Sequence, residues 1–320
     1  MKGRTAFAVL LLAAAFAAGC TAIAVWTAPE KTASATRTEA AERADALFWT
    51  TLHAGDYEGI PRAISALTAA YLADPRDPVT AAHLGWLHIW RLVERARLDP
   101  VPPGITDHAV LSRKYFEEAV RLRPGEARYL GFYASILLAE GNIHKDQKLT
   151  RQGYFTLQDS IRAWPEFNLF TAGYVMSGQA WDGNTYRGAL EQMWRNVEAC
   201  IGEGADRANP DYARFMRLET REGPKRVCWN SEIAPHNFEG FFLNFGDMLV
   251  KSGQVDTARV MYRNATLARE YPTWPYRSVL EARLRDAAAN VAAFRVVPPA
   301  SGAPRMMVES PFACVGCHQR

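Results

Sequence analysis

Apolar residues recur at helical spacing along most of the chain. Residues 80–90, 115–120 and 129–138 carry them three and four positions apart, which places them on one face of a helix. The same spacing continues with interruptions over residues 39–294, and β-branched residues rarely alternate with polar ones. The sequence therefore predicts an all-α body over residues 39–295, followed by a separate C-terminal segment over residues 296–320.

Prolines and glycines interrupt this pattern and are expected to separate the helices. They lie at Asp77-Pro78, Pro102-Pro103-Gly104, Pro124-Gly125, Gly141, Pro165, Gly178, Gly253 and Pro272. Three times a helix runs to a proline and the next one opens with aromatic and small residues, over residues 118–134, 159–174 and 257–284. This recurring sequence pattern resembles tetratricopeptide repeats, whose unit is a helix–turn–helix of about 34 residues.

The resemblance to tetratricopeptide repeats covers residues 46–293 and implies a degenerate array of helix pairs, because Pro124 and Pro165 are farther apart than one unit. A non-repetitive helical domain is the alternative. An array of this kind has a concave face that binds a peptide or a partner domain. Five tryptophans either line such a face or belong to the core, namely Trp86, Trp90, Trp181, Trp194 and Trp274.

The first residues have the order of a secretory signal. Lys2 and Arg4 precede an uncharged apolar run that ends in small residues and Cys20, and the run is shorter than the roughly 20 residues of a membrane span. It resembles the lipobox of bacterial lipoproteins. The resemblance implies removal of residues 1–19, lipidation of Cys20 and, since Thr21 is not Asp, the periplasmic side of the outer membrane. An ordinary signal peptide and an uncleaved anchor are the alternatives. Residues 20–38, rich in Ala, Thr and Ser, are expected to be a flexible tether.

The chain has five cysteines, an odd number for an exported protein. Cys20 is the expected lipidation site, and Cys314 and Cys317 lie together near the C-terminus. Cys200 and Cys228 remain, and an oxidising compartment favours a disulfide between them that closes the loop over residues 201–227. Two unpaired buried thiols are the alternative.

The chemical motif is at residues 314–318, which read Cys-Val-Gly-Cys-His. It resembles the attachment sequence of c-type haem. The resemblance implies that Cys314 and Cys317 bind one haem c covalently through its vinyl groups, and that His318 is the proximal ligand of the haem iron. A dithiol–disulfide redox pair and half of a zinc site are the alternative interpretations.

Only Gln319 and Arg320 follow the motif, whereas small cytochromes c carry it at the start of their domain. We therefore expect the haem segment to pack on the helical body, since an exposed apolar macrocycle is costly. The distal ligand stays open, and five-coordinate haem is one possibility. The candidates are His236 first, then Met306, Met307, His83, His88, His108 and His144.

Charge excludes one class of partner. The net charge of +3 is small and the basic residues are scattered among acids, so no nucleic-acid partner is expected. No phosphate-binding loop, hydrolase elbow or metalloprotease helix occurs. The sequence favours a membrane-anchored c-type cytochrome lipoprotein that exchanges electrons with a protein docked on its helices, rather than an enzyme. A helical scaffold lipoprotein without redox activity is one alternative, and a haem enzyme or gas sensor is the other.

Overall fold

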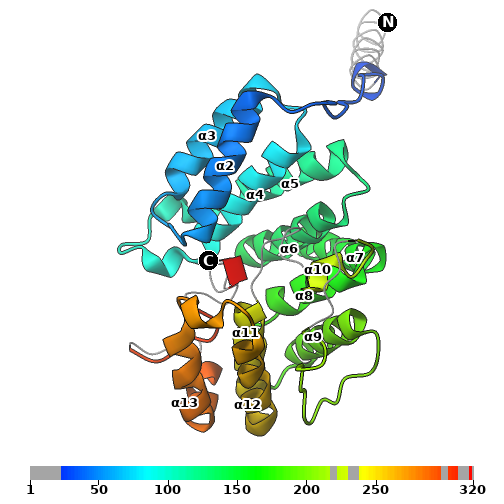
Figure 1. Ribbon diagram of the computed structural model, residues 1–320. Helices are drawn as coiled ribbons and strands as arrows, with labels where there is room; N and C mark the ends of the chain where they lie inside the picture. Colours follow the sequence, from blue (N-terminus) through cyan, green and yellow to red (C-terminus); the bar gives the residue numbers. More distant parts are fainter. Residues whose placement is uncertain (1–22, 217–221, 230–237, 297–301, 309–316, 319–320) are drawn as a thin grey trace, which may run out of the picture. The chain divides into compact units, whose positions relative to one another are not determined.

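The computed structural model describes residues 23–216, 222–229, 238–296, 302–308 and 317–318 (Figure 1). The chain divides into two compact units, Met1–Ala33 and Ser34–Arg320. Within the first unit, residues 23–26 are helical. The described part of the second unit contains helices and no strand, which confirms the all-α prediction.

The second unit is built from consecutive helices. The α-helices are α2 (Glu39–His53), α3 (Ile60–Ala73), α4 (Pro78–Val93), α5 (Asp107–Leu122), α6 (Ala127–His144), α7 (Gln147–Ala163), α8 (Pro165–Val175), α9 (Asn184–Ile201), α10 (Arg226–Trp229), α11 (Phe238–Ser252), α12 (Val255–Asn264) and α13 (Arg277–Arg295). Short 3-10 helices lie at Arg95–Arg97, Pro103–Thr106, Ala265–Leu267 and Tyr271–Thr273.

Local sequence signals explain where many of these helices begin and end. The Asp77 carboxylate accepts a hydrogen bond of 3.0 Å from the backbone N–H of Val79, and Pro78 is the first residue of α4. Gly253, with a φ of 94°, ends α11 in the left-handed conformation that favours glycine. Helix α2 starts at Glu39 and helix α13 ends at Arg295.

Gly141 was expected to separate helices, but this prediction was wrong, because Gly141 lies inside α6. A Cβ atom at this position would lie 2.6 Å from Thr150 Oγ1 and 2.8 Å from the Thr150 nitrogen. The missing side chain therefore lets α7 cross α6 closely. A glycine that serves a close crossing cannot be distinguished from a breaker by sequence alone.

Each helix packs mainly on its neighbours in the chain, with α4 against α5, α6 against α7, α8 against α9 and α11 against α12. Helix α13 also packs on α11, so α11, α12 and α13 form one group. Small residues allow several of these approaches. A Cβ at Gly85 of α4 would lie 2.6 Å from the Phe116 ring of α5.

Most of the singled-out tryptophans belong to the core. Trp90, Trp194 and Trp274 are buried. Trp181 is 38% exposed, and the Arg295 guanidinium lies 3.6 Å from the centre of its ring. Trp86 is half-buried, and its ring is 5.4 Å from that of Phe132.

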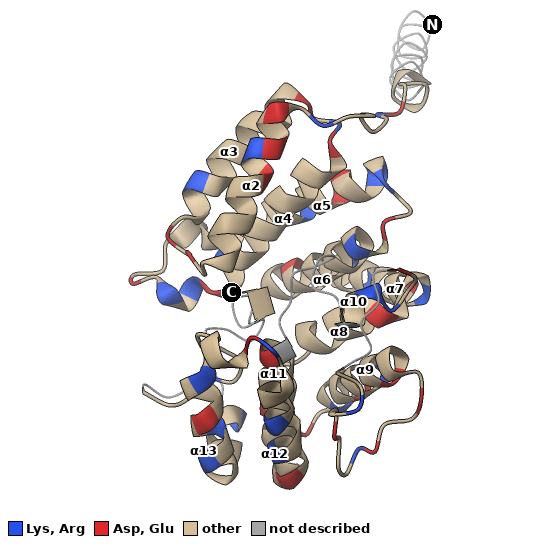
Figure 2. Cartoon of the chain, viewed as in Figure 1, with Lys and Arg blue, Asp and Glu red and all other residues tan. Residues whose placement is uncertain are grey.

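The second compact unit includes residues before α2. The Ser34 backbone nitrogen donates to the Arg76 carbonyl at 3.0 Å, and the Arg37 guanidinium pairs with Asp77 and Asp45. These contacts join residues 34–38, which the sequence analysis assigned to a flexible tether, to α2 and to residues 76–77 before α4. No described helix is both long enough and apolar enough to cross a membrane. Acidic and basic residues are interspersed along the helices (Figure 2).

Candidate functional site

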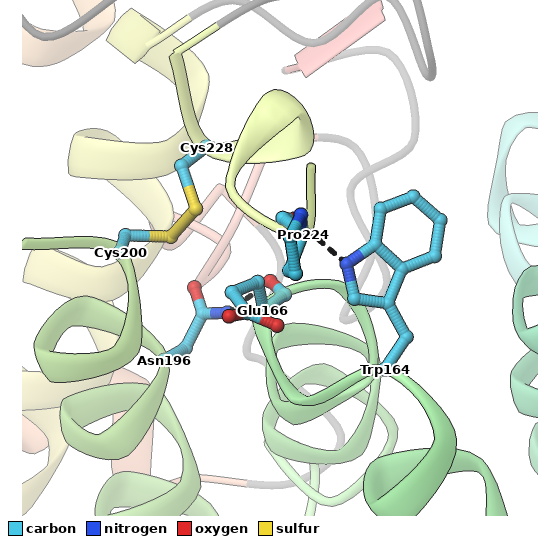
Figure 3. The surroundings of a disulfide bond; sticks show 6 residues. All are labelled: Trp164, Glu166, Asn196, Cys200, Pro224 and Cys228. Atoms are coloured by element: carbon cyan, nitrogen blue, oxygen red, sulfur yellow. Dashed lines mark hydrogen bonds between the residues drawn. A yellow bond between two sulfur atoms is a disulfide. The ribbon is translucent and has the colours of Figure 1, made fainter. Parts of the chain in front are cut away.

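Cys200 and Cys228 are joined by a disulfide, the pair expected from the sequence (Figure 3). Cys200 lies in the last turn of α9 and Cys228 in α10, with their Cα atoms 5.6 Å apart. Neighbouring contacts tie both ends to α8 and the residue before it. The Trp164 indole donates to the Pro224 carbonyl at 2.8 Å, and the Asn196 amide donates to the Glu166 carbonyl at 2.6 Å.

The described end of the C-terminal motif lies inside the helical unit. Cys317 and His318 form a short helical segment and are 4% and 3% exposed. The Asn244 amide of α11 donates a hydrogen bond of 3.5 Å to the Cys317 sulfur. The Trp86 ring of α4 meets the His318 imidazole edge to face at 5.1 Å between ring centres. Figure 1 shows this short red segment between α4 and α11.

Burial determines the ionisation of the groups around Cys317. It raises the pKa of the Cys317 thiol to about 12, although hydrogen bonds from Asn244 and Tyr174 act in the opposite direction. Burial also raises the pKa of the Tyr174 hydroxyl well above its usual value. The same cause raises the pKa of Glu239, in the first turn of α11. At neutral pH Cys317 is therefore a protonated thiol in a region of low polarity.

Two buried acceptors near this thiol have no hydrogen-bond partner in the described part of the chain. They are Asn244 Oδ1 and Glu239 Oε1. A buried polar group without a partner costs about 1–3 kcal/mol. Their position near the Cys317 thiol fits a cofactor with polar groups at its edge.

Aromatic side chains are concentrated in the same region. Phe132 of α6 contacts both Trp86 and Phe167 at 5.4 Å and 6.0 Å. Phe170 of α8 contacts Tyr174 at 4.1 Å. Aromatic surroundings of this kind suit a flat apolar ring. The residues present are therefore compatible with a haem attached at Cys317 and ligated by His318.

A second set of contacts holds the segment of residues 302–308. The Met307 backbone nitrogen donates to Asp247 Oδ2 at 2.8 Å, and the Met307 side chain is wholly buried. Asp247 also accepts from Arg283 at 3.0 Å and from the Tyr262 hydroxyl at 2.5 Å. Burial raises the pKa of Asp247, while Arg283, Tyr262 and the Met307 N–H counteract this shift.

Asp247, Tyr262 and Arg283 were not among the site residues predicted from the sequence. One signal was present, because Asp247 stands in the apolar run of residues 241–250 and a charge there needs a partner. Its partners Tyr262, Arg283 and Met307 are 15, 36 and 60 positions away along the chain.

Several predicted site residues lie outside the described residues, namely Cys20, Cys314 and His236. Three other candidate ligands have different partners. His83 Nδ1 lies 2.5 Å from the Asp45 carboxylate. His88 and His108 face each other with their Nδ1 atoms 2.7 Å apart.

The remaining candidates also differ in their surroundings. His144 is exposed in the last turn of α6, and Met306 is partly buried against the core. The Met307 sulfur lies 3.8 Å from the Ser177 hydroxyl. Among the described residues, no group of three or more His, Cys, Asp or Glu side chains is arranged to bind a metal ion. No family profile, curated protein or solved structure matches this chain.

Proposed function

We propose that this protein is a lipid-anchored c-type cytochrome, with one haem attached through Cys314 and Cys317 and with His318 as the proximal iron ligand. The observation that best supports the proposal is the burial of Cys317 and His318 inside the helical unit. A haem beside Cys317 and His318 would be shielded from water, and such burial is one of the factors that set its reduction potential.

When bound, the haem supplies reversible one-electron chemistry. The chain supplies attachment, orientation and exclusion of water. Cys317 would attach the haem, and the Asn244 amide donates to its sulfur and so orients it. His318 would be the iron ligand, and its edge-to-face contact with the Trp86 ring restricts rotation of the imidazole. The low polarity around Cys317 and His318 raises the cost of a net charge and so contributes to the reduction potential.

We further propose that the helices form a degenerate tetratricopeptide-like array on which a redox partner docks. Small residues at helix crossings support this arrangement. Gly85 faces Phe116, Gly131 faces Asn168, and a Cβ at Gly153 would lie 2.9 Å from the Leu138 nitrogen. Crossings through small residues are typical of tetratricopeptide units.

The anchor in this proposal is Cys20 on the periplasmic side of the outer membrane. Its support is the signal-like sequence of residues 1–19 and the division of the chain between Ala33 and Ser34. A body joined to its lipid by a short segment can approach partners in the same membrane.

Intact-mass analysis of the full chain, produced with the machinery for haem c maturation, tests the proposal. A mass increase of one haem that survives denaturation and acid–acetone extraction is the expected result. A well-folded protein that never carries this mass contradicts the proposal and favours a helical scaffold lipoprotein.

A further inference from the structure

Helix α11 contacts the C-terminal segment at two places on one face. Asn244 donates to the Cys317 sulfur, and Asp247 accepts from the Met307 backbone nitrogen. Residues three apart on a helix lie on the same side, about 5 Å apart along its axis. Met307 and Cys317 therefore contact the same face of α11.

Helix α8 and the residues after it also contact both Cys317 and Met307. Tyr174 lies beside Cys317, and the Ser177 hydroxyl lies 3.8 Å from the Met307 sulfur. The Lys251 ammonium donates to the Ser177 carbonyl at 2.9 Å and the Gln179 carbonyl at 2.8 Å, which fixes this end of α8 to α11. Met307 and Cys317 are thus held between α8 and α11, which the Lys251 contacts join to each other.

Asp247 is the centre of the upstream contact. It is wholly buried, and its ion pair with Arg283 has an N–O distance of 3.0 Å. Arg283 also donates to the backbone carbonyl of Arg305. One buried ion pair therefore bonds to two backbone groups of residues 302–308. Asp247 accepts from the Met307 N–H, and Arg283 donates to the Arg305 carbonyl.

Stability of the helices does not explain a charge pair at this position. Replacing a buried ion pair by apolar residues of similar volume is often neutral or stabilising, because desolvation of the charges offsets their attraction. Specifying one arrangement of the chain is the better-attested use of such a pair. Here the arrangement includes Met307 with a φ of 53°, a conformation that is unfavourable for a residue other than glycine.

We propose that Asp247 is the positioning residue of the haem segment: together with Arg283 it holds Met307, and thereby keeps Cys317 and His318 seated between α4, α8 and α11. The relevance to haem rests on the proposed function. The docking itself is tested in haem-free protein, so the two ideas can fail separately.

The test compares how fast a thiol reagent labels Cys317 in the haem-free full chain. Cys20→Ser and Cys314→Ser in the background leave Cys317 as the free thiol, since Cys200 and Cys228 are bonded to each other. The combined variant carries Asp247→Leu and Arg283→Met, which remove the acid and the base. It also carries Tyr262→Phe, because the Tyr262 hydroxyl would otherwise lose its acceptor. We expect Cys317 to be labelled at least about tenfold faster, while the helical circular dichroism spectrum stays unchanged. A tenfold change needs only a small change in the free energy that keeps Cys317 buried.

A matched control removes a different buried ion pair. Arg113→Met with Glu140→Leu eliminates the 2.7 Å contact between α5 and α6, which does not involve residues 302–308. Labelling in this control should stay at the background rate. Unchanged labelling in the combined variant, or equal acceleration in the control, would overturn the proposal.

A second variant acts from the side of the segment and leaves α11 to α13 intact. Met307→Pro removes the N–H that Asp247 accepts, and the proline ring forbids a φ of 53°. It should accelerate labelling as the combined variant does, and slow labelling would again contradict the proposal. In haem-loaded protein, both variants should shift the reduction potential downward, because a water-exposed haem favours its oxidised, more charged state. An unshifted potential would show that Asp247 does not position the haem.

Discussion

The side-chain amide of Asn244 donates a hydrogen bond of 3.5 Å to the sulfur of Cys317, across 73 positions of sequence. It links the middle of an apolar helix to the last cysteine of the chain. The donor amide is itself wholly buried, so the contact is made in a region without water. This bond and the Trp86–His318 contact hold Cys317 and His318 in the helical body.

Acid should destabilise the protein through the pair His88 and His108. Burial, followed by the charge of His108, lowers the pKa of His88 from 6.5 to about 3. Between pH 6.5 and about pH 3, His88 is protonated in the unfolded chain but neutral in the folded protein. Protonation therefore favours the unfolded chain in this range. The contribution of neutral His88 to the free energy of unfolding is complete above pH 6.5 and is lost as the pH falls toward 3. The limiting slope is about 1.4 kcal/mol per pH unit.

Urea unfolding of His88→Asn between pH 7 and pH 4.5 tests this expectation, because asparagine keeps a polar group near the Nδ1 position. The variant should lose less stability over this range than the wild type does. The exposed His144→Asn is the control and should follow the wild type. Equal pH dependence of wild type and His88→Asn would show that the pair does not account for acid lability.

Two glycine substitutions should change stability in opposite directions. A Cβ at Gly246 in α11 would lie 2.2 Å from the Tyr262 ring, so Gly246→Ala should lower the free energy of unfolding by about 1–3 kcal/mol. At Gly188 in α9 nothing lies within 4 Å of the added atom, and Gly188→Ala should raise it by about 0.5–1 kcal/mol. Thermal and urea unfolding measure both. A harmless Gly246→Ala would contradict the close approach of α12 to α11.

Removal of the disulfide should weaken the fold without abolishing it. Cys200→Ser with Cys228→Ser should lower the free energy of unfolding by about 3 kcal/mol, mainly because the unfolded chain gains freedom. In the wild type both cysteines should resist alkylation until a reductant is added. Immediate labelling of either thiol would exclude the bond.

Lipidation of Cys20 predicts how the protein partitions. Cys20→Ser should move it from the detergent-extracted membrane fraction to the soluble periplasmic fraction, and leave the helical spectrum of the body unchanged. Detergent phase separation followed by immunoblotting measures this. A variant that stays with the membrane would argue for an uncleaved anchor instead.

Local signals made much of the fold predictable. Thr38 accepts a hydrogen bond from the Ala41 nitrogen and so sets the start of α2, as a threonine before an acidic first turn predicts. The cysteine pairing followed from elimination among five residues. The helix start depends on residues close together in the chain, and the cysteine pairing depends on a count of cysteines. Both kinds of information can be read directly from the sequence.

Long-range pairing was not predictable in the same way. Trp86 and Trp90 stand one turn apart on α4, yet Trp90 is core and Trp86 contacts His318. Helical periodicity assigns both to similar faces and cannot say which one meets a segment more than 200 residues later. The partners of Asp247 could not be predicted for the same reason, because periodicity does not say which helices become neighbours.

The absorption spectrum of the purified full chain tests the central claim most directly. The protein is produced together with the haem c maturation machinery, and spectra are recorded before and after dithionite, with Cys314→Ala alongside. A sharp α-band in the reduced wild type that is lost in the variant is the predicted result. A well-folded wild-type protein without haem, from cells whose maturation machinery is intact, would contradict the account.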